Sequence, residues 1–384
     1  MSHDFSGSQL FGYTLLAGTK TSRLLGGTMH HTVITGTGRY IPSVVVPNAA
    51  FLEHRFHGPD HQPLDKPNET ILEQFEAITG IRERRYAPPE LVTSDMAFLA
   101  AEDALASSGT DPESLDCLLV AHNFGDVVHG TRHSDLVPSL ASRVKHRLRI
   151  RNPRTVAMDV VFGCPGWLQG VILADGMIRC GDVRRALVIG ADTLSRISDP
   201  HDRDSLIYAD GAGATLLEAR ETPAGLLAHA VRSDTYEHGR MLLMGPSYKE
   251  GAFLEALFLK MEGRKLYKYA LGHVAAAIQG CLDQAGVPLR DVAKVLIHQA
   301  NGKMDEAILE ALYRQAGLGA PPEGVMPMTI SWLGNSSVAT IPTLLDLLRK
   351  GELEGHALRP GDTVVFASVG AGMNINAVVY RLPD

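Results

Sequence analysis

Cys164 has the residue type and the setting of a catalytic nucleophile. It follows the apolar run Thr155–Val161 and a short turn, and it directly precedes Pro165. Proline is favoured at the first helical position, so the pattern predicts that Cys164 is the N-cap of a helix ending near Cys180. A thiol there feels the positive end of the helix dipole, which favours the thiolate and lowers the pKa. The alternative is a cysteine that only packs between strand and helix.

His298 and Asn335 are two further polar residues at the expected ends of strands and helices. His298 ends a buried apolar run and is followed by the polar residues Gln299 and Asn301. Polar side chains at the end of a buried strand are typical of a site in α/β proteins. Asn335 follows Gly334 at an expected helix start, where capping alone is the simpler interpretation. Taken alone, therefore, His298 is a candidate site residue and Asn335 is first of all a helix cap.

The elements that must position these residues follow an α/β pattern. Short runs rich in Val, Ile and Leu alternate with helical stretches, and most runs lack polar alternation, as in strands covered on both faces. The expected strands are His31–Gly36, Cys117–His122, Thr155–Val161, Ala186–Gly190, Gly213–Glu218, Leu226–Ser233, Ala293–His298, Gly324–Met328, Thr363–Ser368 and Asn376–Leu382.

The second half of the chain resembles the first. Ser114–His122 is similar to Asp291–His298, and the helix that begins at Cys164 has a counterpart that begins at Asn335. An internal duplication explains this and would bring Cys164 and Asn335 together near a pseudo-twofold axis. The alternative is that α/β units simply resemble one another. The expected organisation is a flexible N-terminal extension over 1–28, an N-terminal half over 29–225 and a C-terminal half over 226–384.

The composition limits the classes of function. The 384 residues are 45% hydrophobic and 21% charged with a net charge of −7, which is typical of a soluble globular protein and argues against nucleic acid as a partner. No apolar run approaches the ~20 residues of a membrane helix, and residues 1–28 lack a secretory signal, so we expect a cytoplasmic protein without a membrane partner. The four cysteines are scattered, so neither a zinc site nor a disulfide framework is indicated.

Several motifs occur in an order that resembles one family. From about Thr32 to Leu382 the chain is similar to β-ketoacyl-acyl-carrier-protein synthase III, a member of the thiolase-like superfamily. The matching stretches are Gly36–Pro42, Thr79–Arg84, the turn at Cys164, Asp199–Arg203, Asp210–Ala214, His298–Asn301, Gly334–Ser337 and Gly370–Gly372.

The resemblance implies a thiolase-like five-layer α/β/α/β/α fold built from two duplicated halves. It also implies that Cys164 accepts an acyl group, and that His298 and Asn335 stabilise the enolate formed when a malonyl thioester loses carbon dioxide. The resulting carbanion would attack the acyl-cysteine in a Claisen condensation. Backbone N–H groups of Cys164 and of the Gly370–Ala371 turn would form the oxyanion hole.

The resemblance also implies the partners. These are acyl-CoA or an acyl-carrier protein, a malonyl-acyl-carrier protein and a second copy of the chain, whose contact stretch would include Val137–Pro138. The substrates are linked to phosphopantetheine, and no metal or redox cofactor is required. Asn301 and Lys303 are expected to bind the carrier, although a solvated lysine is an equal alternative for Lys303.

Four positions depart from the family pattern. The Trp and Arg that usually clamp coenzyme A are replaced here by Gln74 and Ile78, which leaves room for a carrier-protein donor. Phe162 and Trp167 stand near Cys164 where small residues are usual, so we expect them to add bulk at the acyl pocket and to bind an unusual acyl group.

Two insertions, Glu53–Thr70 and His129–Asp135, could cover the entrance of the tunnel or be surface decoration. The pathway implied by the resemblance is fatty-acid biosynthesis or a specialised lipid or polyketide pathway, and these departures favour the specialised one. One alternative is a ketosynthase of the aryl-polyene or dialkylresorcinol type that uses a β-ketoacyl or unsaturated acyl partner. A second is a non-catalytic partner subunit of a condensing enzyme, against which the intact trio of Cys164, His298 and Asn335 argues.

Overall fold

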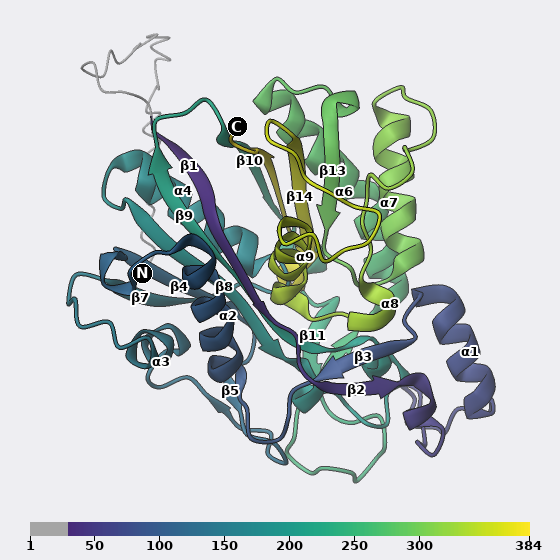
Figure 1. Ribbon diagram of the computed structural model, residues 1–384. Coiled ribbons are helices and arrows are strands. Elements are labelled where there is room, and N and C mark those ends of the chain that lie inside the picture. The colour runs from purple at the N-terminus through teal and green to yellow at the C-terminus, as the bar shows by residue number, and fades with distance from the viewer. Residues whose placement is uncertain (1–29) are drawn as a thin grey trace, which may run out of the picture.

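Two β-sheets form the frame of the protein. The computed structural model describes residues 30–384, so the extension expected over 1–28 lies outside the described residues. The first sheet has the order β1-β9-β8-β4-β7 and the second has the order β10-β15-β14-β13 (Figure 1). Their bounds are β1 His31–Tyr40, β4 Cys117–His122, β7 Val156–Val161, β8 Arg185–Thr193, β9 Asp210–Arg220, β10 Gly225–Ser233, β13 Val292–Ile297, β14 Thr363–Gly370 and β15 Asn374–Arg381.

The two sheets share one topology. In the first, β1 and β8 pair with β9 in antiparallel fashion, and β4 runs parallel to β8. In the second, β10 and β14 pair with β15 in antiparallel fashion, and β13 runs parallel to β14. The first sheet draws on residues 31–220 and the second on residues 225–381. The repeat predicted from the sequence therefore appears as two copies of the same strand order.

Helices form three layers around these sheets. The outer face of the first sheet is covered by α2 and α3, and that of the second by α6 and α7, each through its own apolar cluster. Between the sheets lie α4 and α9, whose apolar residues form one cluster with the inner faces of both sheets. This confirms the five-layer prediction. The bounds are α2 Thr93–Ser108, α3 Leu140–Arg147, α4 Gly166–Cys180, α6 Gly263–Ala285, α7 Gly302–Gln315 and α9 Thr340–Arg349.

Smaller elements that the sequence did not predict lie at one end of the two sheets. Figure 1 shows β2, β3 and α1 together at the lower right of the molecule, beside α8. No helix of the described part of the chain is both long and apolar enough to cross a membrane. The bounds are α1 Asn68–Thr79, β2 Val44–Pro47, β3 Glu83–Tyr86, β5 Asp126–Val127, β6 Ser134–Asp135, α5 Thr235–His238, β11 Leu242–Gly245, β12 Phe258–Met261 and α8 Ile330–Leu333.

The strand predicted over Gly324–Met328 is wrong. The segment runs beside β13 and its Val325 carbonyl accepts one hydrogen bond from the Val295 N–H at 2.8 Å, but no ladder forms. Pro327 has no N–H to donate, and its carbonyl accepts from the Gln299 amide instead. The apolar side chains resemble those of a strand, whereas the backbone bonds are those of a connecting segment.

Candidate active site

Cys164 lies at the junction of β7 and α4. The helix begins at Gly166, and Pro165 is its N-cap residue. Cys164, which we predicted to be the N-cap, therefore lies one residue before it. The turn after β14 packs directly against it. A Cβ atom added to Gly370 would lie 2.6 Å from the backbone nitrogen of Cys164, closer than real Cβ contacts. The Cys164 and Gly370 backbones are therefore in contact across the two halves of the chain.

The predicted lowering of the Cys164 pKa is wrong. Burial raises the pKa of the thiol to about 11, and the negative charge of Asp192 acts in the same direction. A hydrogen bond from the Ser337 hydroxyl to the Cys164 sulfur, with 3.5 Å between Oγ and Sγ, lowers the pKa but does not offset the burial. The thiol is therefore neutral at neutral pH in the free protein.

Asn335 is held by backbone bonds to a neighbouring loop. Its N–H donates to the Ile207 carbonyl at 3.0 Å, and its carbonyl accepts from the Ala209 N–H at 2.8 Å. Gly334 before it has φ +69°, a left-handed conformation that suits glycine. The Asn335 Oδ1 accepts from the Ser337 N–H at 2.8 Å, so the amide group does cap the following turn. This bond uses the oxygen and leaves the Nδ2 donor available.

His298 follows directly after β13. Its backbone N–H donates to the Ala367 carbonyl at 2.9 Å, which continues the register of the parallel pair β13–β14. The side chain is 4% exposed. Burial lowers the pKa of the imidazole to about 4, although a backbone interaction with Ser337 opposes the shift. At neutral pH the ring is neutral, with one N–H donor and one free lone pair.

A buried hydrogen-bonded chain leads away from Cys164. The Asn123 amide Nδ2 donates to the Ser337 oxygen at 2.9 Å and to Asp192 Oδ2 at 2.6 Å. The Asn123 N–H donates to Asp192 Oδ1 at 2.9 Å, and burial raises the pKa of Asp192 to about 6. The sequence analysis missed these three residues. The repeat could have identified Asn123. It follows β4, the strand that corresponds to β13, just as His298 follows β13.

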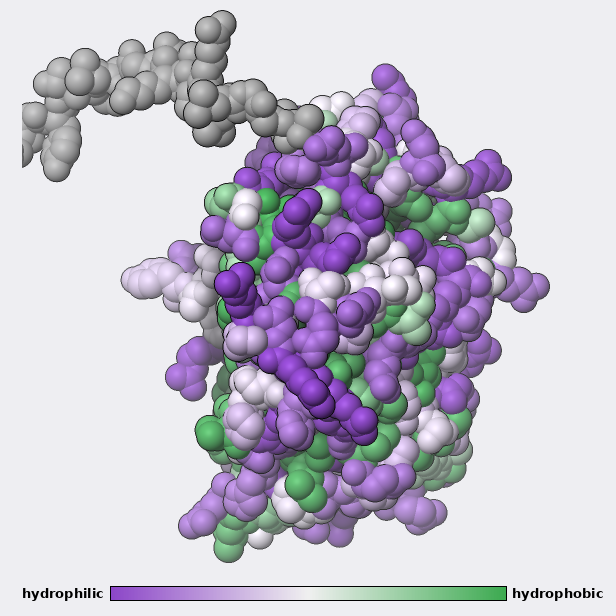
Figure 2. Space-filling model, turned by 60° about the vertical axis from the view of Figure 1, so that its left-hand side comes forward, coloured by the Kyte–Doolittle hydropathy of each residue, from purple (hydrophilic) through white to green (hydrophobic). Residues whose placement is uncertain are grey.

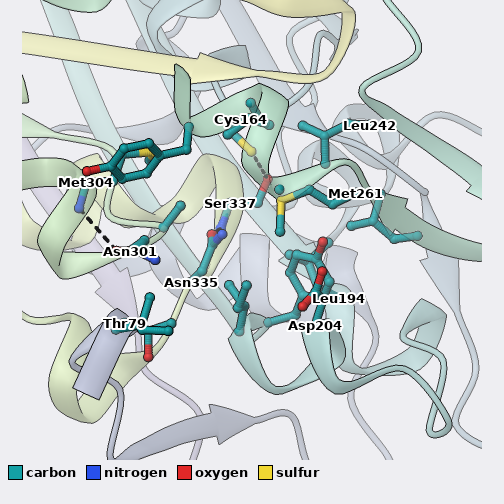
Figure 3. A pocket seen from close by; sticks show the side chains of 18 of the residues that line it. Thr79, Cys164, Leu194, Asp204, Leu242, Met261, Asn301, Met304, Asn335 and Ser337 are labelled. Carbon is teal, nitrogen blue, oxygen red and sulfur yellow. Dashed lines mark hydrogen bonds between the residues drawn. The ribbon is translucent and has the colours of Figure 1, made fainter. Parts of the chain in front are cut away.

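One cavity is lined by these side chains. It has a volume of about 790 Å³, and Cys164, His298 and Asn335 all line it, together with Ser337 and Asn123. Figure 3 shows Cys164 above Ser337 and Asn335, with the hydrogen bond from Ser337 to the sulfur drawn as a dashed line. The three residues singled out from the sequence thus meet in one cavity, with Cys164 from one half of the chain and the other two from the second half.

The cavity is also lined by residues expected at the coenzyme A clamp. Gln74 and Ile78 both line it, as does Asn301, whose side-chain oxygen accepts from the Met304 N–H at 3.1 Å and caps α7. Lys303 is exposed and is not among the lining residues. Four basic residues that the sequence analysis did not single out line the cavity: Lys66, Arg203, Arg264 and Lys268.

The expectation that Phe162 and Trp167 flank the acyl pocket is wrong. Trp167 is 1% exposed and packs edge-on against Phe366 in the core between the sheets, with ring centroids 5.8 Å apart. Phe162 packs against the same core cluster, and neither side chain lines the cavity. Trp167 points into the core because α4, the helix on which it lies, is buried on nearly all sides.

The two insertions differ in their relation to the cavity. The first contributes Lys66 to the lining, whereas no residue of His129–Asp135 is part of it.

Within residues 30–384, no group of three or more His, Cys, Asp or Glu side chains is arranged to hold a metal ion.

Two regions of the chain match the family described as 3-oxoacyl-[acyl-carrier-protein (ACP)] synthase III. Residues 158–235 match its main domain, and residues 282–382 match its C-terminal domain. The first region contains Cys164, and the second contains His298 and Asn335.

Solved structures show the same similarity over nearly the whole chain. The 3-oxoacyl-[acyl-carrier-protein] synthase III of Aquifex aeolicus VF5 is 28% identical with a TM-score of 0.73, covering 91% of this chain and 99% of that one. The priming β-ketosynthase of the R1128 polyketide pathway is 25% identical with a TM-score of 0.76, covering 94% and 99%. OleA of Xanthomonas campestris, at 18% identity and a TM-score of 0.72 over 92% and 99%, shares the fold.

Proposed function

Because the chain belongs to the 3-oxoacyl-[acyl-carrier-protein] synthase III family, we propose that it joins an acyl thioester to a malonyl thioester with loss of carbon dioxide. The observation that carries this proposal is the shared cavity, in which Cys164, His298 and Asn335 meet from separate segments. The product is a β-ketoacyl thioester. We assign the three residues to two half-reactions, acyl loading and condensation.

In the loading step, the Cys164 sulfur attacks the carbonyl carbon of the acyl donor and displaces its thiol. Since the Cys164 pKa is about 11, the thiol proton leaves as the new bond forms rather than beforehand. We assign the free lone pair of the His298 imidazole as the acceptor, and the proton finally goes to the departing thiol. Ser337 donates to the sulfur and stabilises the negative charge that develops on it.

In the condensation step, His298 and Asn335 donate to the carbonyl oxygen of the malonyl thioester. Decarboxylation builds negative charge on that oxygen, and each donor stabilises it; losing one such donor typically costs ~10²–10³ in rate. The carbanion then attacks the acyl group on Cys164 and releases the cysteine sulfur. We assign the oxyanion hole to the backbone N–H of Cys164 and one from the Gly370–Ala371 turn, and the close approach of the Cys164 and Gly370 backbones supports this assignment.

The substrates reach the cavity on a phosphopantetheine arm. Three of the four basic residues that line the cavity, Lys66, Arg264 and Lys268, would attract its phosphate groups or those of coenzyme A. Gln74 and Ile78 line the same cavity without the charge or the aromatic face of a coenzyme A clamp, which favours a carrier protein as donor. Each residue acts through hydrogen bonds or its own thiol, so the scheme requires neither a metal nor a redox cofactor.

A second copy of the chain is the expected partner. The strand β7 is an edge of the first sheet, and its Val156, Met158 and Val161 side chains are 51%, 40% and 64% exposed. Leu136 and Val137 are also exposed. Figure 2, turned to bring forward the side on which β7 lies in Figure 1, shows separate hydrophobic patches among hydrophilic residues. Pairing of two β7 edges would bury these apolar side chains and complete the ladder.

Intact-mass spectrometry of the acyl-enzyme tests the proposal. After incubation with acyl-CoA and acyl-carrier donors, the wild type should gain the mass of one acyl group, and Cys164→Ala should gain none. Cys180→Ala is the matched control, because it removes an exposed thiol at the other end of the same helix. An adduct of wild-type amount in Cys164→Ala would contradict the assignment of the nucleophile.

A further inference from the structure

A carboxyl group lies on the wall of the cavity among apolar neighbours. Asp204 belongs to the short turn Arg203–Ile207 and lines the cavity close to Leu194 and Met261. In Figure 3 it lies on the other side of Asn335 from Met304. Burial, followed by the negative charge of Asp202, raises the pKa of this carboxyl to about 6. The proposed mechanism does not use Asp204.

A tyrosine with an unsatisfied hydroxyl lies on the same segment. Tyr208 lines the cavity and is 4% exposed, and within residues 30–384 its hydroxyl has no hydrogen-bond partner. Buried polar groups are nearly always paired, so an orphaned hydroxyl is an unusual feature. Burial, and then the nearby charge of Asp204, raise the pKa of the phenol well above its ordinary value. Tyr208 is therefore a neutral phenol close to Asp204.

Tyr208 holds this segment next to the reacting groups. It forms a backbone bridge with Asn335, and its phenol is close enough to the Cys164 thiol for the two groups to interact electrostatically. The segment is anchored from behind by Arg84, which is fully buried and donates from Nε to the Leu206 carbonyl at 3.1 Å. A group that reaches Asp204 and Tyr208 would consequently belong to the part of the substrate near the thioester.

Within residues 30–384, no buried cation pairs with Asp204. Lys260 lies nearby but bonds Asp199 at 2.6 Å and Asp202 at 3.1 Å. Arg203 forms an ion pair with Asp204, with 3.7 Å between Nε and Oδ1, but this pair is long and partly solvated, since the two side chains are 59% and 34% exposed. The carboxyl group therefore keeps acceptor capacity on the cavity side.

We propose that Asp204 and Tyr208 form a subsite for a hydroxyl group on the acyl chain, placed a few carbons from the thioester. One hydroxyl satisfies both partners, because it donates to the Asp204 carboxylate and accepts from the Tyr208 phenol. A plain alkyl chain in the same place would leave both groups desolvated and unpaired, and such sites discriminate strongly against the analogue that lacks the polar group. The inference rests on the proposed function, since it specifies the acyl group that Cys164 accepts.

The test compares acylation of Cys164 by matched pairs of donors. Each pair is a straight-chain acyl thioester and its β-hydroxyacyl analogue, offered at several chain lengths as CoA and carrier-protein thioesters. The wild type should load the hydroxylated member at least about tenfold faster in kcat/KM. Tyr208→Phe, which removes only the hydroxyl, and Asp204→Asn should each reduce this preference while still loading the straight-chain donor. Tyr313→Phe is the control, because Tyr313 is equally buried but lies outside the cavity.

The outcomes separate this inference from the function on which it rests. Equal loading of both donors by the wild type and by both variants would overturn the subsite and leave the condensing function intact. A preference for the hydroxylated donor that Tyr208→Phe and Asp204→Asn retain in full would also overturn it. No adduct on Cys164 with any donor would overturn the proposed function, and the subsite with it.

Discussion

At the scale of single residues, two effects act on the Cys164 thiol in opposite directions. A helix start favours the thiolate by roughly 0.3–1 kcal/mol, which is less than one pKa unit. Burial can shift a pKa by several units, and here it determines the result. Pro165 also removes one of the N–H donors that a helix start usually offers. The remaining stabilisation comes from Ser337, through a side chain that is distant in sequence.

Removing the Ser337 hydroxyl should make Cys164 less reactive. Since the Cys164 pKa is about 11, the thiolate fraction rises with pH, and the rate of alkylation by iodoacetamide should rise about tenfold per pH unit between neutrality and about pH 9. In Ser337→Ala the pKa rises further, so the rate at each pH should fall by about two- to tenfold. The measurement is the alkylation rate of Cys164, followed by peptide mass spectrometry across this range.

The neighbouring serine provides the control for that measurement. Ser336 has its hydroxyl 3.4 Å from the Thr340 hydroxyl, and its side chain makes no hydrogen bond to Cys164 in the described structure. Ser336→Ala should therefore alkylate at the wild-type rate. Equal rates in Ser337→Ala and the wild type would show that the Ser337 hydroxyl does not stabilise the thiolate.

At the scale of elements, the turn after β14 packs directly against the start of α4. Both carry backbone N–H groups that the proposed oxyanion hole uses, and their contact depends on the absence of a side chain at Gly370. The φ angle of Gly370 is −165°, which any residue can adopt. The glycine is therefore required by the close approach of Cys164 and not by backbone conformation.

Gly370→Ala should separate the two halves of the oxyanion hole. The new Cβ would meet the Cys164 nitrogen at 2.6 Å, so the turn must move by several tenths of an ångström. We expect the rate of acyl transfer to Cys164 to fall by about 10²-fold or more, because oxyanion donors act only at short distance. The measurements are the rate of acyl-enzyme formation by mass spectrometry and the thermal unfolding midpoint.

Gly280→Ala is the control for the general effect of replacing a glycine by alanine. Gly280 lies in α6 with no other group within 4 Å of an added Cβ. Gly280→Ala should keep full activity and gain about 0.5–1 kcal/mol in unfolding free energy. If Gly370→Ala also kept full activity, the proposed oxyanion hole would be wrong.

At the scale of the whole molecule, the duplicated fold joins groups from separate halves. In the first half, Cys164 lies between β7 and α4. In the second half, His298 follows β13 and Asn335 lies in the segment before α9, and all three line the cavity. Within residues 30–384, the first sheet has a fifth strand, β7, without a counterpart in the second. That strand is the exposed apolar edge, so the departure from symmetry is also the surface that we assign to the partner copy.

A charge on the β7 edge should dissociate the expected dimer. Met158→Asp would place an unpaired carboxylate among apolar side chains in a paired interface, whereas it would stay hydrated in a monomer. Light scattering coupled to size exclusion should therefore give a dimer mass for the wild type and a monomer mass for the variant. Val231→Asp is the matched control: Val231 is 49% exposed on β10, an edge of the second sheet. A wild-type monomer, or a Met158→Asp dimer, would contradict the β7 interface.

The sequence by itself determined the local elements and the family. Nine of the ten expected strands are present within a few residues, because runs of Val, Ile and Leu bounded by turn residues identify buried strands. The repeated order of these runs indicated the duplicated fold, and three polar residues at strand and helix ends indicated the cavity. The exception, Gly324–Met328, has the apolar pattern of a strand but contains Pro327, which cannot donate to a ladder.

Only the tertiary structure decided the environment of each side chain. The Cys164 pKa depends on burial by residues far away in the chain, and the direction in which Trp167 points depends on a second sheet that packs over α4. Asp204 and Tyr208 lie outside the motifs found in the sequence, and they acquire their roles from their neighbours across the fold. Periodicity is a property of consecutive residues, whereas burial, electrostatic interaction and cavity shape arise between segments that meet only when the chain folds.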